Sequence, residues 1–186
     1  SQHHDSGYFR PLQEIGGVLN GSTNADRTNY WEVVPSNAVE LALWLESDRM
    51  GFLLDSLDLV KLNAQRDIVK NERRQGVDNQ PYGRAFEILA KATYPPTHPY
   101  SWDVIGSMAD LSAATEEDVK SFFRLYYAPN NAILTIVGDF DPAQTKAWVQ
   151  KYFGDIPRGQ ALTRPVVAPV TLDSEQRLVY EDRVQV

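Results

Sequence analysis

The sequence of 186 residues contains no cysteine, and this absence excludes disulfides, thiolate metal sites and a cysteine nucleophile within the chain. Histidine is also scarce, because only His3, His4 and His98 occur. None of the three has the spacing of a metal-binding pair. Any metal site built from this chain alone would therefore rely on carboxylates.

Long hydrophobic runs and basic blocks are missing as well. No stretch approaches about 18 consecutive apolar residues, so the sequence predicts no membrane-spanning helix. The 18 Lys and Arg residues are outnumbered by 25 Asp and Glu residues, which gives a formal net charge of −7. A chain this acidic repels phosphate groups, so we expect no nucleic-acid partner. The GxGxxG, P-loop, GxSxG and HExxH motifs are also absent.

The composition that remains is that of a folded protein, with 42% hydrophobic and 11% aromatic residues. Ser1 is not an initiator methionine, and residues 177–186 have a strand pattern with no turn after it. We therefore expect a piece of a longer protein. Residues 1–160 are predicted to form an α+β domain that lacks its beginning, 161–174 a linker, and 175–186 the first strand of a following segment.

The order of predicted elements mixes strands and helices. Two strand patterns at 17–23 and 28–34 flank a turn at 24–27 and predict an antiparallel hairpin. A continuous apolar run at 132–137 predicts a buried central strand. Helical patterns cover most of the remaining chain, at 6–15, 38–50, 56–76, 82–92, 115–127 and 142–153.

We expect these elements to form an α+β two-layer sandwich, with helices packed on one face of a mostly antiparallel sheet. A doubly wound parallel fold is the alternative. It requires a regular alternation of strands and helices, and the three consecutive helices within residues 38–92 argue against it.

Two of the predicted helices have clear N-terminal signals. Thr115 followed three residues later by Asp118 is typical of a capping box. Asp141 followed by Pro142 combines an N-cap residue with a proline at the first helical position. We therefore expect helices to begin directly after Thr115 and Asp141.

One carboxylate falls on a helix face that the sequence otherwise makes apolar. In the helix predicted at 56–76, apolar residues recur at steps of three and four, and Glu72 is the next position on that face. The apolar positions are Leu57, Val60, Ala64 and Ile68. A carboxylate in such a position is rare unless it is paired or binds a metal. Because the helix is near its end there, a solvated Glu72 beside two arginines is the other interpretation.

The first strand of the hairpin offers a second candidate site. Asn20, Gly21, Ser22 and Thr23 are small or polar, and a strand with small residues lets another backbone come close. An extended peptide can add to such a strand through main-chain hydrogen bonds. An ordinary hairpin, whose glycines serve only the turn, is the other interpretation.

Five stretches of the sequence, taken in order, resemble the pitrilysin/insulinase family of zinc peptidases, in particular its smaller bacterial members that are similar to mitochondrial processing peptidase. The stretches are Gly16–Tyr30, Leu45–Met50, Gln65–Gln75, His98–Tyr100, and Tyr126–Ala132 with Ile136–Phe140. The resemblance covers residues 7–160, and it implies the fold of that family's peptidase domain.

Members of this family bind zinc through an inverted His-x-x-Glu-His motif and a distant glutamate about 75 residues further on. The resemblance implies that Glu72, within Asn-Glu-Arg-Arg, is this distant ligand, and it favours the metal-binding interpretation of the residue. It also implies that Asn20 and the residues after it, Gly21, Ser22 and Thr23, line the substrate cleft, where the peptide binds as an added strand.

The sequence departs from the family pattern at several positions. Counting back about 75 residues from Glu72 leads to a point before Ser1, so no catalytic residue is assigned within this chain. Many relatives carry a carboxylate where this chain has Gln65, and many have alanine where it has Gly21. Because one carboxylate alone holds zinc too weakly, we expect the chain as given to bind no catalytic zinc and to cleave nothing.

The resemblance implies that the parent protein is a zinc metalloendopeptidase, which hydrolyses peptide bonds with a zinc-activated water. Its partners would be extended peptide or protein substrates and a related subunit in a homo- or heterodimer. The alternative is a non-catalytic partner or structural subunit of such an assembly, which binds peptides or proteins without cleaving them. The resemblance favours a periplasmic or otherwise extracytoplasmic bacterial location.

Overall fold

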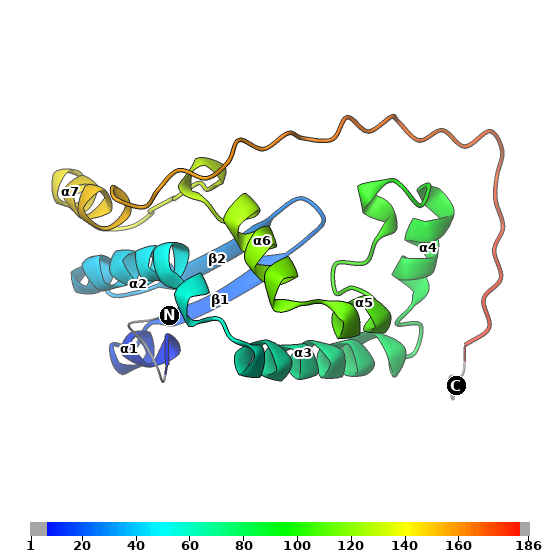
Figure 1. Ribbon diagram of the computed structural model, residues 1–186, viewed down its shortest axis with the longest axis horizontal. Coiled ribbons are helices and arrows are strands. Elements are labelled where there is room, and N and C mark those ends of the chain that lie inside the picture. The colour runs from blue at the N-terminus through cyan, green and yellow to red at the C-terminus, as the bar shows by residue number, and fades with distance from the viewer. Residues whose placement is uncertain (1–6, 183–186) are drawn as a thin grey trace. The chain divides into compact units, whose positions relative to one another are not determined.

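The computed structural model describes residues 7–182, and the chain forms two compact units (Figure 1). The first unit comprises the described part of Ser1–Thr23 together with Arg27–Leu59 and Thr115–Thr163. The second comprises Asn24–Asp26, Val60–Ala114 and the described part of Arg164–Val186. Among the described residues, no helix combines the length and the apolar character that crossing a bilayer requires.

The first unit contains the predicted hairpin. β1 (Val18–Thr23) and β2 (Thr28–Val33) pair antiparallel, in a register that sets Thr23 opposite Thr28. These two threonines flank the turn at 24–27, and their hydroxyl oxygens lie 3.2 Å apart. Within the described residues, no other strands pair.

Four α-helices complete the first unit, namely α1 (Phe9–Glu14), α2 (Val39–Phe52), α6 (Glu116–Tyr126) and α7 (Pro142–Phe153). Two of them begin where the sequence predicts. Thr115 and Asp118 form a capping box before α6, in which the Asp118 N–H donates to Thr115 Oγ1 at 3.1 Å and the Thr115 N–H donates to Asp118 Oδ2 at 2.8 Å. Asp141 Oδ1 caps α7 by accepting the Gln144 N–H at 2.7 Å.

Helix α2 packs on one face of the hairpin. The Arg49 guanidinium lies 3.8 Å from the centre of the Tyr30 ring on β2. The Tyr8 hydroxyl donates to Glu32 Oε1 on β2 at 3.0 Å and also donates to Glu46 on α2. Tyr30 and Glu32 are two positions apart and therefore point to the same side of the strand. The fold is thus α+β, with helical cover on one side of an antiparallel sheet, as predicted.

Helices α2 and α7 lie side by side and enclose the core of the first unit (Figure 1). Leu45 of α2 is fully buried, and so is most of Thr145 of α7. At the edge of this contact Glu40 Oε1 accepts hydrogen bonds from Lys151 Nζ at 3.1 Å and from the Tyr152 hydroxyl at 2.7 Å. Burial of one leucine side chain stabilises a fold by about 2 kcal/mol, so apolar packing outweighs the exposed ion pair here.

The second unit is mostly helical. It contains most of α3 (Leu59–Arg73), the π-helical turn Arg74–Asp78 that follows it, α4 (Ala85–Thr93) and α5 (Met108–Ala113). Within this unit the Tyr100 hydroxyl donates to Asp26 Oδ1 at 2.7 Å and so connects the loop before α5 to the hairpin loop.

The predicted strand at 132–137 is not formed. These residues have no strand structure, and Ile133 and Val137 are 94% and 90% exposed. A strand is stable only when a neighbour satisfies its backbone groups, and the described residues supply no partner for this one. The apolar run indicates a tendency to form a strand, but the segment has no strand partner among the described residues.

The predicted strand at 175–186 falls partly outside the described residues. Residues 175–182 have no strand structure, and 183–186 are not described. The segment 161–174 likewise has no helix or strand. The proposed boundaries of the domain, linker and following segment stay a prediction.

Candidate functional site

Glu72 lies in the last turn of α3 and is exposed to solvent, so the prediction that it faces the interior is wrong. The buried residues of α3 are Leu62 and Arg73, which are only 8% and 6% exposed. By contrast Val60 and Ile68, on the face that the sequence suggests as buried, are 78% and 47% exposed. The buried face is therefore the one that ends at Arg73.

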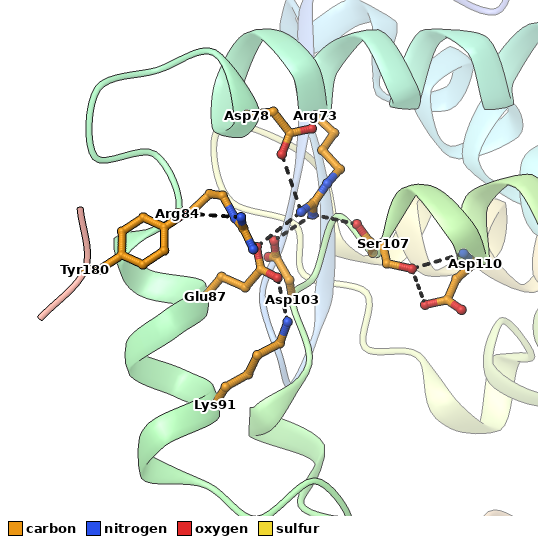
Figure 2. A network of polar contacts seen from close by, with 10 residues as sticks. Arg73, Asp78, Arg84, Glu87, Lys91, Asp103, Ser107, Asp110 and Tyr180 are labelled. Carbon is orange, nitrogen blue, oxygen red and sulfur yellow. Dashed lines mark hydrogen bonds and ion pairs between the residues drawn. The ribbon is translucent and has the colours of Figure 1, made fainter. Parts of the chain in front are cut away.

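Arg73 is buried, and four oxygen atoms surround its guanidinium group. Figure 2 shows this cluster. Its Nη1 donates to the Gly106 carbonyl oxygen at 2.7 Å and to Asp103 Oδ2 at 3.3 Å. Its Nη2 donates to Glu87 Oε2 at 3.1 Å and lies 3.6 Å from Asp78 Oδ1. A buried arginine is stable only when its charge and its N–H groups are satisfied in this way.

The carboxylates of this cluster are matched by further cations. Glu87 Oε1 accepts from Lys91 Nζ at 2.6 Å, and Glu87 Oε2 lies 3.6 Å from Arg84 Nε. The hydrogen bond from Lys91, followed by the one from Arg73, lowers the pKa of Glu87 below its ordinary value. Three cations therefore face three carboxylates in the cluster, those of Asp78, Glu87 and Asp103.

Sequence periodicity alone misses Arg73, because a search for a buried apolar face treats arginine as a surface residue. The signal that could have found it is the set of acids at Asp78, Glu87 and Asp103, five to thirty positions further along the chain. Those acids meet only once the turn after α3, helix α4 and the following loop have folded together.

Glu72 has no such partners. Within the described residues its carboxylate makes no hydrogen bond or ion pair, which leaves both oxygens available to a ligand. No group of three or more His, Asp or Glu residues in 7–182 is arranged to hold a metal ion. Glu72 therefore fits as one donor of a metal site, and the other donors would have to come from outside the described residues.

His98 does not add a donor next to Glu72. Its Nδ1 accepts the Tyr100 N–H at 3.1 Å, and its ring stacks on Tyr94 with centroids 4.6 Å apart. This is the loop role, with a hydrogen-bond task, that is ordinary for a histidine between prolines. His3 and His4 lie outside the described residues.

The candidate peptide-binding residues all lie on β1. Asn20, Gly21, Ser22 and Thr23 are exposed, and Asn20 Oδ1 accepts the Gly21 N–H at 2.8 Å. Within the described residues β1 pairs only with β2, so its other edge carries no strand. An unpaired edge offers main-chain donors and acceptors to an extended peptide, which fits the predicted role without testing it.

Gly21 is tightly placed opposite Tyr30. A Cβ atom at this position would lie 3.3 Å from the Asn29 carbonyl oxygen and 3.5 Å from Tyr30 Cδ1. An alanine here would fit only if the neighbouring strand gave way by a few tenths of an ångström. The glycine is thus consistent with a slightly closer approach of the two strands.

Behind the hairpin, two carboxylates share one cation. Glu32 of β2 and Glu46 of α2 both accept from the Tyr8 hydroxyl, while Arg49 pairs with Glu46. Burial, followed by the neighbouring charge of Glu46, raises the pKa of Glu32 to about 7. The layer beneath the candidate peptide-binding strand therefore changes charge near neutral pH.

A cavity of about 380 Å³ lies between α2 and α7 and is lined by residues that include Trp44, Phe52 and Tyr152. Neither Glu72 nor any of the residues from Asn20 to Thr23 borders it. This cavity is therefore not at either candidate site, and we assign it no role.

Comparison with known proteins supports the family that the motifs indicate. A family model described as "Peptidase M16 inactive domain" matches residues 113–185. The zinc protease PqqE of Helicobacter pylori is 34% identical over 142 residues, which cover 76% of this chain and 31% of PqqE. Mitochondrial-processing peptidase subunit beta of Saccharomyces cerevisiae is 24% identical over 150 residues, which cover 81% of this chain and 32% of that protein.

Comparison with solved structures gives matches to proteases as well. A protease from Helicobacter pylori superposes with a TM-score of 0.79 at 31% identity, over 86% of this chain and 38% of that chain. Pitrilysin superposes with a TM-score of 0.68 at 24% identity, over 89% of this chain and 18% of that chain, which shows a shared fold. The chain spans about a third of the length of the curated relatives it matches. From its motifs, its fold and these relatives, we conclude that the chain belongs to the pitrilysin (M16) family of zinc peptidases.

Proposed function

We propose that this chain is the part of a zinc metalloendopeptidase that supplies one zinc ligand, Glu72, and one peptide-binding strand, Asn20 to Thr23. The single observation that carries the proposal is the carboxylate of Glu72, which is exposed and unpaired among the described residues while its neighbour Arg73 is buried. The relatives described as zinc proteases support the metal.

The parent protein is proposed to bring the His-x-x-Glu-His motif to Glu72 from another part of the chain. Bound zinc would supply a Lewis acid that lowers the pKa of water from about 15.7 to about 7. Glu72 offers a carboxylate oxygen to complete a three-ligand site. The edge of β1 holds an extended peptide by main-chain hydrogen bonds, so that orientation depends little on the side chains of the substrate.

The proposal is tested in the parent protein, meaning the longer chain that carries the His-x-x-Glu-His motif together with these residues. Glu72→Gln keeps the size of the side chain but removes the charge that binds zinc. We expect zinc affinity, measured by competition with a chromogenic chelator, to fall at least about tenfold, and peptidase activity to fall with it. Asp67→Asn on the same helix, also at an exposed acid, is the matched control and should change neither. Unchanged zinc affinity in Glu72→Gln would refute the role of this residue.

The 186-residue chain on its own is proposed to bind no catalytic zinc, since a single carboxylate ligand is weak. Isothermal titration with zinc at neutral pH should show no tight one-to-one binding. A tight site with unit stoichiometry would mean that donors within this chain assemble in a way that the proposal does not include.

A second function is favoured by one specific observation: the family model that matches residues 113–185 is described as an inactive domain. In that case the chain belongs to a non-catalytic subunit that binds peptides or a related subunit without cleaving them. The two functions can be distinguished in the parent protein, because an intact zinc motif and a zinc-dependent peptidase activity would support only the first.

The substrate class and the location are proposed from relatives. One solved structure with 24% sequence identity to this chain is of the ferredoxin protease FusC in complex with Arabidopsis ferredoxin. The protease PqqL of Escherichia coli is described as periplasmic. We propose a peptide or protein substrate, a related subunit as a homo- or heterodimeric partner, and a periplasmic or other extracytoplasmic location.

A further inference from the structure

The residue next to Glu72 is the most completely enclosed charged group of the second unit among the described residues. Arg73 is 6% exposed, and its guanidinium binds the Gly106 carbonyl oxygen together with Asp78, Glu87 and Asp103. Figure 2 shows Asp78, Glu87 and Asp103 converging on Arg73 from different segments of the chain. This cluster has no part in binding a metal or a peptide in the function proposed above.

Arg73 lies at the C-terminal end of α3, where the regular helix stops. The helix ends at Arg73, and the chain then widens into the π-helical turn Arg74–Asp78, in which the Asn79 N–H returns to the Arg74 carbonyl oxygen at 2.8 Å. Such π-helical turns are rare, less tightly wound than an α-helix and often found at functional sites. The last turn of α3 therefore lacks the regular helix that would otherwise continue and hold it.

The contacts of the Arg73 side chain hold the end of α3 in place of a continuing helix. Asp78 lies at the end of the π-helical turn, Glu87 lies on α4, and Asp103 and Gly106 lie in the loop before α5. One side chain thus fixes the end of α3 to three other segments. Consecutive residues of a helix share one backbone turn, so fixing Arg73 also fixes the direction in which Glu72 leaves the helix.

We propose that Arg73 is a positioning residue, which holds the last turn of α3 so that the carboxylate of Glu72 is presented to zinc in one orientation. This inference rests on the proposed role of Glu72 as a zinc ligand. Groups that orient a metal ligand without touching the metal typically change metal affinity by about 10- to 100-fold.

The test compares two lysine substitutions at neighbouring arginines in the parent protein. Arg73→Lys keeps the charge but loses the planar fork that reaches Gly106, Asp103 and Glu87 together. Arg74→Lys is the matched control, because Arg74 is exposed and donates only to Asn71 Oδ1, at 2.8 Å, in the described structure. We expect chelator competition to show about tenfold weaker zinc binding for Arg73→Lys and a change within about twofold for Arg74→Lys.

Leu62→Ala distinguishes the proposed positioning role of Arg73 from a purely structural one, because it removes a buried side chain from the same helix. This variant should lower the midpoint of thermal unfolding at least as much as Arg73→Lys but leave zinc affinity within about twofold. In the 186-residue chain, amide hydrogen exchange of residues 70–73 should accelerate in Arg73→Lys relative to Arg74→Lys, which requires no zinc. Equal losses of zinc affinity in Leu62→Ala and Arg73→Lys would overturn the inference.

The outcome also distinguishes this inference from the function on which it rests. If Glu72→Gln leaves zinc affinity unchanged, the proposed zinc ligand fails and the positioning role fails with it. If Glu72→Gln weakens zinc binding and Arg73→Lys does not, only the positioning role is refuted. Should Arg73→Lys fail to fold, Asp103→Asn removes one partner while leaving the cation, with about threefold weaker zinc binding expected from the same mechanism.

Discussion

Two regions of the molecule place an arginine beside acidic residues, and the pKa of one acid in each region shifts in opposite directions. Around Arg73, each acid meets at least one cation, and Glu87 meets three. Around Arg49, two acids, Glu32 and Glu46, share one cation. The pKa of Glu87 is consequently lowered and that of Glu32 is raised to about 7. Burial and the neighbouring charge of Glu46 raise the pKa of Glu32, whereas the hydrogen bonds from Lys91 and Arg73 lower that of Glu87.

The comparison has a consequence for stability against pH. A carboxyl group with a lowered pKa in the folded state stabilises the fold above its ordinary pKa, and that contribution is lost as the pH falls. A carboxyl group with a raised pKa stabilises the fold at low pH, and its contribution is lost as the pH rises through the raised value. The Arg73 cluster should therefore weaken in acid, and the Glu32 region should weaken as the pH rises from 4.5, the ordinary pKa of Glu32, to about 7.

The largest effect is expected where the balanced cluster loses its centre. Arg73→Met keeps most of the volume of the side chain but leaves Asp78, Glu87 and Asp103 near one another without the shared cation. Breaking a buried ion pair in this way typically costs about 3–5 kcal/mol, so the free energy of unfolding by urea should fall by that amount. Arg74→Met should change it by less than about 0.5 kcal/mol. A loss below about 1 kcal/mol for Arg73→Met would show that water already satisfies the cluster.

A smaller effect, of opposite sign, is expected in the unbalanced region. Glu32→Gln keeps an oxygen that accepts from the Tyr8 hydroxyl but removes the charge that faces Glu46. Because Glu32 is only partly buried, solvent screening limits the gain, and we expect the variant to be more stable than the wild type by about 1 kcal/mol at pH 8. At pH 5 the difference should be much smaller, since Glu32 is then mostly protonated in the folded wild type.

The measurement is urea unfolding of both proteins at pH 5, 6, 7 and 8. Glu14→Gln serves as the control, because Glu14 is an exposed acid paired with Arg10 and its removal should change stability by less than about 1 kcal/mol. If the stability of Glu32→Gln relative to the wild type is the same at all four pH values, the pKa of Glu32 is not raised in the folded protein.

The smallest effect concerns the exposed edge of the balanced cluster. Lys91→Ala removes the cation that contributes most to the lowered pKa of Glu87, at a distance of 2.6 Å. Lys91 is mostly exposed, so the loss should be about 0.5 kcal/mol at pH 7, and smaller still in 1 M NaCl. The loss should be smaller near pH 3, because protonation of Glu87 increases as the pH falls towards its lowered pKa. Lys146→Ala, at an exposed lysine of α7, should change stability at neither pH.

Local signals in the sequence predicted the local parts of the fold. The capping box of Thr115 with Asp118 and the N-cap of Asp141 are confirmed, because these motifs are satisfied within one helical turn. The hairpin is confirmed for the same reason, since its turn fixes the register of both strands. Interactions within a few residues of one another need no knowledge of the rest of the molecule.

Features that depend on distant residues could not be predicted in this way. The buried face of α3 ends in an arginine because acids from beyond the helix surround it, and apolar periodicity carries no information about such a partner. Helix periodicity singled out Glu72 and strand composition singled out Asn20 to Thr23, and the resemblance to a family then favoured their proposed roles. Their exposure is now described, while their roles as zinc ligand and substrate strand stay proposals.

The unpaired run at 132–137 has a practical consequence for handling this chain. Six residues without charge or proline, with Ile133 and Val137 almost fully exposed, have the character of segments that initiate cross-β aggregation. Solutions of the isolated chain should therefore become turbid as concentration rises, and a lysine at position 133 should delay this onset. The same exposed run makes light scattering, measured before any binding assay, the first useful check of a preparation.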